Sequence, residues 1–119
     1  MKQLKLRVSK KHFQAILKGE QKVEERFIYP DNEHRYITVT ENPDDTITIN
    51  PIHYDEIRFV QGRTPDAPVI VVKVTGSQFV VLTDENGEDL TYEEDGETYV
   101  VCQVWYNLGE VVSKENVAE

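Results

Sequence analysis

The sequence predicts an α+β fold, a mixed β-barrel capped by one helix near the N-terminus. Short alternating apolar segments recur along the 119 residues, and turn-forming residues separate them every few positions. One early segment has helical spacing instead. Many short strands with frequent turns are typical of barrels and sandwiches. A chain of this length forms one domain with its own core, so we expect residues 1–119 to be a single domain.

The first elements follow from local patterns. Residues 2–8 alternate apolar and polar side chains, which predicts a half-buried strand. Ser9 is a good N-cap because its hydroxyl accepts from free backbone amides. Apolar residues between Phe13 and Leu17 have the three- and four-residue spacing of a buried helical stripe. Gly19 suits the left-handed position that ends many helices.

The rest of the chain reads as strands and turns. Residues 21–28 form a strand that Pro30 and the polar segment after it stop. Asn86-Gly87 and Asp95-Gly96 are dipeptides that favour tight hairpin turns. The further strands we expect are residues 35–40, 46–49, 54–60, 69–75, 79–83 and 97–106.

Charge is divided unevenly along the chain. Residues 1–26 hold eight Lys/Arg and three Glu, a net of +5, and residues 27–119 hold five Lys/Arg and nineteen Asp/Glu, a net of −14. Binding along a nucleic-acid duplex needs a broad basic surface, because it is driven by phosphate neutralisation and counterion release. One basic segment on an acidic protein therefore indicates a nucleic-acid ligand with a small footprint. It argues against binding along an extended duplex.

Composition also bears on location. No apolar segment approaches the roughly 20 residues of a membrane span, and the Met-Lys-Gln-Leu start carries no hydrophobic signal region. The single Cys102 has no partner for an internal disulfide. We expect a soluble, cytoplasmic protein without a membrane partner.

Three charges alternate after the helix. Lys22, Glu24 and Arg26 fall on one face of the expected strand, with Val23 and Phe27 on the other. One interpretation is the rim of a polar cleft, where Arg26 offers a planar donor fork to a base edge or a phosphate. The other is a solvated strand face with weak ion pairs. Both stay open from the pattern alone.

Other reactive residue types give weaker patterns. His12, His34 and His53 show no metal-ligand spacing and read as surface or turn histidines, so we expect no metal and no cofactor. The acidic segment 84–97 has Gly87 at the fourth position where a calcium loop needs glycine at the sixth, so it reads as a solvated hairpin. Cys102 reads as an inert core residue.

Trp105 alternates with Gln103 on the face opposite Cys102. An indole on such a face serves either as a stacking platform for a base or as packing against neighbouring side chains. The sequence leaves both roles open.

The segment from Gly19 to Arg26 reads G-E-Q-K-V-E-E-R. With the apolar helix before it, Y-D-E-I-R-F-V-Q-G in the middle of the chain and W-Y-N-L-G near the end, it resembles the ASCH domain family, a branch of the PUA-like β-barrel superfamily. In that family a helix ends in G-x-K-x-x-E-x-R. Gly19, Glu24 and Arg26 match this motif, whereas Gln21 stands at the lysine position and Lys22 follows it.

The resemblance implies an RNA- or nucleoside-binding module with a cleft beside the first helix. Its expected ligand-binding residues are Gln21, Lys22, Glu24, Arg26 and Trp105. Some small members of the family hydrolyse N4-acylated cytidines with the motif lysine as base and a threonine at the position of Glu24. Gln21 cannot act as a base, so the amidohydrolase interpretation is weakened. The resemblance therefore leaves the catalytic residues unassigned.

Three functions therefore remain open from the sequence. The first is a binding domain for RNA or a small nucleoside-like ligand. The second is a small amidohydrolase acting on N4-acylated cytidine. The third is a non-catalytic protein-interaction domain, in which the charged strand face is structural and the acidic segment contacts a basic partner.

Overall fold

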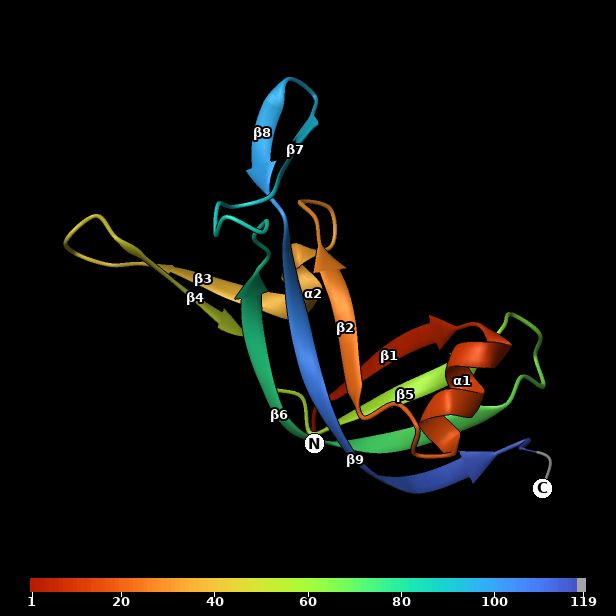
Figure 1. The fold of residues 1–119 in the computed structure, drawn as a ribbon. Coiled ribbons are helices and arrows are strands. Elements are labelled where there is room, and N and C mark those ends of the chain that lie inside the picture. The colour runs from red at the N-terminus through yellow and green to blue at the C-terminus, as the bar shows by residue number, and fades with distance from the viewer. Residues whose placement is uncertain (118–119) are drawn as a thin grey trace. The chain divides into compact units, whose positions relative to one another are not determined.

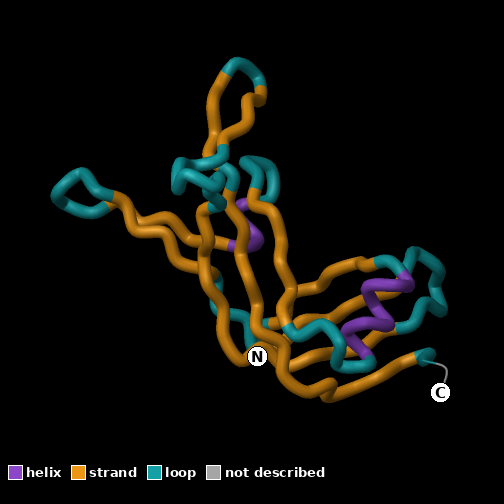
Figure 2. The backbone as a smooth tube through the Cα atoms, in the orientation of Figure 1, coloured by secondary structure: helices purple, strands orange, loops and turns teal. Residues whose placement is uncertain are grey.

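The chain is built mainly from strands. A computed structural model describes residues 1–117 and places 56% of the chain in strands and 10% in helices, which agrees with the α+β expectation. Figure 2 shows this balance, with short helical segments in a backbone that is mostly strand. The elements in chain order are β1 (Gln3–Val8), α1 (Lys10–Leu17), β2 (Val23–Ile28), α2 (Glu33–Tyr36), β3 (Ile37–Glu41), β4 (Ile47–Pro51), β5 (Glu56–Gln61), β6 (Val69–Val81), β7 (Thr91–Glu94), β8 (Glu97–Val100) and β9 (Cys102–Glu115).

The largest sheet has five strands in the order β1-β5-β6-β9-β2. β1 runs parallel to β5, and β5 runs antiparallel to β6. The pairs β3–β4 and β7–β8 form two further antiparallel sheets. No closed barrel is found among residues 1–117, so the barrel part of the expectation is not confirmed.

The chain divides into two compact units. The core unit consists of residues Met1–Glu24, His53–Gly76 and Tyr106–Glu119. The hairpin unit consists of residues Glu25–Ile52 and Ser77–Trp105 and contains the β3–β4 and β7–β8 hairpins. The single domain over residues 1–119 stays a prediction.

Helix α1 in the core unit forms where its local signals predict. The Ser9 hydroxyl accepts the His12 N–H at 3.2 Å and caps the first turn. Phe13 and Ile16 are buried, and the helix contacts β5, beside which it lies in Figure 1. After the helix Gly19 adopts φ +74°, a conformation that a side chain would strain.

The turns of the hairpin unit also follow the sequence. Asp95 and Gly96 have φ of 52° and 80°, as a two-residue type I′ turn requires, and they join β7 to β8. Gly87 also has positive φ. In that turn the Asp84 carboxylate accepts the backbone N–H groups of Asn86 and Glu88 at 2.8 and 3.0 Å.

Two strand expectations were wrong. β6 is one strand over Val69–Val81 where we expected two, at 69–75 and 79–83. The expected strand 97–106 breaks at Val101, because its N–H donates to the Leu90 carbonyl and its own carbonyl accepts the Leu82 N–H. Those bonds separate β8 from β9.

A further difference from the expectation lies after β2. Residues 35 and 36, which we expected to begin the strand 35–40, lie instead in the short helix α2, Glu33–Tyr36, and β3 begins at Ile37. The Asn32 side chain accepts the Tyr29 N–H at 2.8 Å and donates to the Phe27 carbonyl at 3.3 Å. These bonds turn the chain sharply enough for one helical turn to follow before β3.

Within the described residues, none of the helices has the length and apolar character that crossing a membrane would require.

Candidate functional site

The central feature of the candidate site is a buried carboxylate, Glu24. Its residue exposure is 0%, although glutamate is rarely buried without partners. Burial alternates along β2, where Glu24 and Ile28 are buried and Phe27 on the other face is 45% exposed. The interpretation of this face as a solvated surface is therefore wrong at Glu24.

His12 reaches Glu24 from helix α1. The imidazole Nε2 lies 2.7 Å from Glu24 Oε1, and the His12 side chain is 32% exposed. A carboxylate can only accept, so Nε2 carries the proton and donates. The expectation of a plain surface or turn histidine was wrong, because α1 places His12 where it bridges a buried group and the surface.

Gln21 completes the cluster. Its side-chain Nε2 donates to the Val23 carbonyl at 3.1 Å and to Glu24 Oε1 at 3.3 Å. The same nitrogen lies 3.2 Å from His12 Nε2. Both N–H groups of the Gln21 amide already donate to oxygen atoms. The 3.2 Å distance therefore separates two donors, Gln21 Nε2 and His12 Nε2, that both donate to Glu24 Oε1. We call His12, Gln21 and Glu24 the polar cluster.

The polar cluster leaves two acceptor atoms for other partners. With Nε2 protonated, Nδ1 of a neutral His12 ring is an acceptor, and Gln21 keeps its amide oxygen. Lys22 next to the cluster is exposed, and its backbone carbonyl accepts the Leu108 N–H at 2.8 Å. The core unit thus holds a buried carboxylate beside the Gln21 amide and the His12 ring, and the exposed Lys22 follows Gln21 in sequence.

The other two expected site residues belong to the hairpin unit. Arg26 is half-buried on β2. Trp105 donates its indole N–H to Gln103 Oε1 at 2.7 Å, so these neighbours on one strand face are hydrogen-bonded to each other. Of the five expected residues, the structure brings Gln21 and Glu24 together directly, and their roles toward a ligand stay predictions.

No group of three or more potential metal ligands is found among the described residues. Cys102 is half-buried, and burial followed by the negative charge of Glu33 raises the pKa of its thiol. A thiol with a raised pKa is a poor nucleophile at neutral pH. Neither metal chemistry nor thiol chemistry is therefore assigned to the residues of this site.

The sequence contained one signal for the cluster that the alternation of charges concealed. Ile28 lies four positions after Glu24 on β2 and therefore on the same face of the strand, and an apolar residue on that face indicates that it points inward. His12 carried no comparable signal, because its contact with Glu24 depends on how the helix packs beside the strand.

Comparison with known protein families, with curated proteins and with solved structures gives no match for this chain.

Proposed function

We propose that this chain is a small binding domain of the ASCH type, PUA-like in descent, that binds a nucleoside or a short single-stranded stretch of RNA through the polar cluster. The observation that carries the proposal is the fully buried Glu24, to which both His12 and Gln21 donate. A buried carboxylate with two convergent donors is costly to build, so it favours a role beyond packing.

The chemistry of the polar cluster suits a nucleobase. An exocyclic amino group donates, and the Gln21 amide oxygen and His12 Nδ1 are acceptors that it could reach. The exposed Lys22 can contact a phosphate or ribose as a point charge. Selectivity would then favour bases that carry an amino group over those that carry only carbonyl groups at that edge.

Charge supports a small ligand. The core unit holds eleven Lys/Arg and eight Asp/Glu, a net of +3, and the hairpin unit holds two and fourteen, a net of −12. A strongly acidic unit in the same chain repels a long phosphate backbone. Binding should therefore involve about one or two phosphates and depend only weakly on salt.

The test is calorimetric titration with cytidine 5′-monophosphate and uridine 5′-monophosphate. We expect the cytidine form to bind more tightly, and Glu24→Gln to weaken it about tenfold, which corresponds to about 1.4 kcal/mol. Glu25→Gln is the matched control, because Glu25 is the exposed neighbour on the same strand. Equal losses in the two variants, or no binding by folded wild type, would reject the proposal.

The His12–Glu24 pair favours hydrolysis of an N4-acylated cytidine as a second function. A histidine held at 2.7 Å by a buried carboxylate has the geometry of a general base and its orienting group. His12 would take a proton from water as its oxygen attacks the acyl carbon. The carbon–nitrogen bond then breaks, and the imidazolium returns the proton to the leaving amine. The products are cytidine and a carboxylic acid.

An assay with N4-acetylcytidine decides between binding and hydrolysis. Under hydrolysis, His12→Ala abolishes turnover, and Lys22→Ala, at the displaced lysine, leaves the chemical step intact. His34→Ala, at an exposed histidine of the hairpin unit, is the control. Absence of acetate release by folded wild type rejects this function and leaves the binding proposal standing.

A further inference from the structure

The hairpin unit contains an apolar cavity of about 570 Å³ that the polar cluster does not use. Elements that are far apart in sequence line it, among them α2, the β3–β4 hairpin and the β7–β8 hairpin, which are labelled in Figure 1. Glu33 is the one charged side chain among its described lining residues. Cavities of this size with apolar walls and few polar groups are typical of binding sites.

Aromatic rings form one wall of this cavity. Tyr92 stacks on Tyr99 with ring centroids 5.4 Å apart, and Tyr29 and Tyr92 form a T-shaped pair with ring centroids 5.8 Å apart. The Tyr99 hydroxyl donates to the Glu97 carboxylate at 2.9 Å and so holds the ring in place. Rigid tyrosines supply contact area at a low entropy cost, which is typical of recognition surfaces.

Aliphatic side chains at the opening remain exposed. Val39, Ile47 and Val100 line the cavity and are 51%, 59% and 42% exposed. Solitary exposed apolar residues are ordinary, but a contiguous set around a cavity marks an interaction surface.

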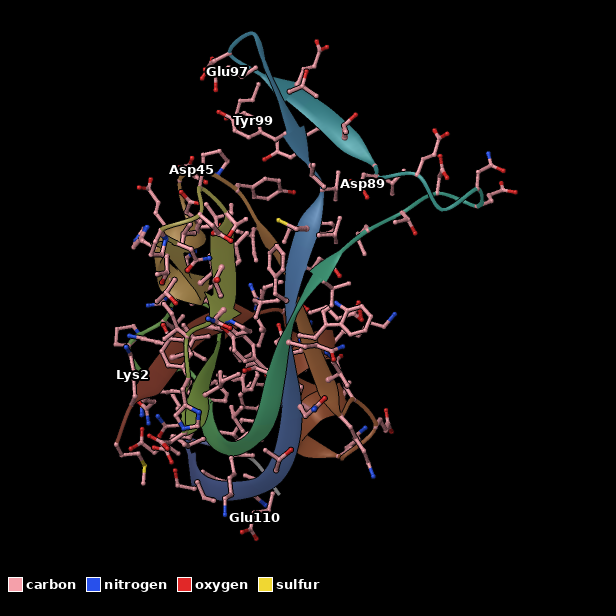
Figure 3. All side chains as sticks on the ribbon, turned by 90° about the vertical axis from the view of Figure 1, so that its left-hand side faces the viewer. Lys2, Asp45, Asp89, Glu97, Tyr99 and Glu110 are labelled. Carbon is pink, nitrogen blue, oxygen red and sulfur yellow. The ribbon has the colours of Figure 1, made fainter. Side chains whose placement is uncertain are left out.

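The charge of the hairpin unit indicates the kind of partner. Two Lys/Arg against fourteen Asp/Glu give it a net charge of −12, and Figure 3 shows carboxylate side chains along the β7–β8 hairpin around Glu97. Burial and then the charge of Glu94 raise the pKa of Tyr92, so the negative potential extends to the aromatic wall. Such a potential repels nucleic acid, anionic lipid and the same surface of a second copy.

We propose that this cavity and its acidic surround bind a basic peptide segment of a partner protein, with apolar side chains of the peptide in the cavity and its Lys/Arg over the carboxylates. The apolar anchors supply affinity, and the charges accelerate and orient the encounter. The proposal is independent of the polar cluster, whose residues all lie in the core unit.

The test uses three short synthetic peptides of equal length. The first alternates lysine with leucine, the second replaces leucine by serine, and the third replaces lysine by glutamate. We expect the first to bind at least about tenfold more tightly than either control, because each control lacks one half of the recognition. If the lysine–serine peptide binds as tightly as the lysine–leucine peptide, charge alone accounts for the binding and the proposal is overturned.

Protein variants locate the binding. Ile47→Ser and Val100→Ser should each weaken the lysine–leucine peptide about tenfold. Val81→Ser and Leu90→Ser are matched controls, because both residues are 40% exposed in the same unit but do not line the cavity. Equal losses in both pairs would overturn the proposal. So would a dimer in sedimentation that Ile47→Ser dissociates, since a second copy would then occupy the cavity.

Discussion

The two units of this chain distribute their apolar residues in opposite ways. Of the described residues, fifteen of the nineteen buried hydrophobic ones lie in the core unit, whereas seven of the nine exposed large ones lie in the hairpin unit. The core unit thus satisfies its apolar groups internally, and its candidate site is polar. The hairpin unit leaves apolar groups at its surface, and its candidate site is the cavity that they border. This difference is the basis for proposing a polar ligand for the core unit and an apolar, basic one for the hairpin unit.

The largest expected difference between the units is in packing. Phe59 is fully buried in the core unit, so Phe59→Ala should lower the free energy of unfolding by about 3–5 kcal/mol. Phe27 is 45% exposed in the hairpin unit, so Phe27→Ala should cost roughly 1 kcal/mol or less. Urea denaturation followed by circular dichroism measures both. Similar losses would contradict the contrast between the two units.

The next effect concerns the polar cluster. Glu24→Gln places an amide where His12 and Gln21 both donate, so we expect a loss of roughly 1–3 kcal/mol in the free energy of unfolding. Glu25→Gln on the exposed face of β2 should stay within about 0.5 kcal/mol of wild type. If urea denaturation gives the same loss in free energy of unfolding for both substitutions, the buried hydrogen bonds of Glu24 do not stabilise the fold.

A smaller effect is expected at the helix cap. Ser9→Ala removes the acceptor of the His12 N–H and should cost about 1 kcal/mol. The loss should also loosen His12 and weaken nucleotide binding. Ser77→Ala, at an exposed serine of the hairpin unit, is the control for both measurements. Unchanged binding in a destabilised Ser9→Ala protein would show that the cap does not position His12.

The smallest effect is a pH dependence in the core unit. The Lys2 N–H donates to the Asp55 carboxylate at 2.8 Å, and this bond lowers the pKa of Asp55 from its ordinary value of 3.8. The stabilisation is therefore present above that value and is lost as the pH falls through the lower folded value. Asp55→Asn should flatten the decline of stability between about pH 5 and about pH 2. Asp66→Asn, at an exposed carboxylate, should leave the slope as in wild type.

Local signals predicted the local features of the fold. The Ser9 cap, helix α1, the positive φ of Gly19 and the Asp95-Gly96 turn all depend on neighbouring residues, and all were confirmed. Strand lengths were predicted less well. β6 passes without a break through residues 76–78, which lie between the two strands that we expected, because ladder pairing with other strands sustains it.

The candidate site was predictable in part. The motif drew attention to Gln21 and Glu24, which do meet, but alternation alone placed Glu24 on a charged face without saying which face is buried. His12 was missed because its role depends on a contact across twelve positions of sequence. The cavity was missed for the same reason, since its walls come from separate hairpins.

The division of ligands between the units is tested most directly by one NMR experiment on the uniformly labelled protein, titrated first with cytidine 5′-monophosphate and then with the lysine–leucine peptide. The account predicts that the nucleotide shifts the amide signals of His12, Gln21 and Glu24. The peptide should shift those of Tyr92, Tyr99 and Val100. Shifts of one common set by both ligands, or of neither set by its own ligand, would contradict it.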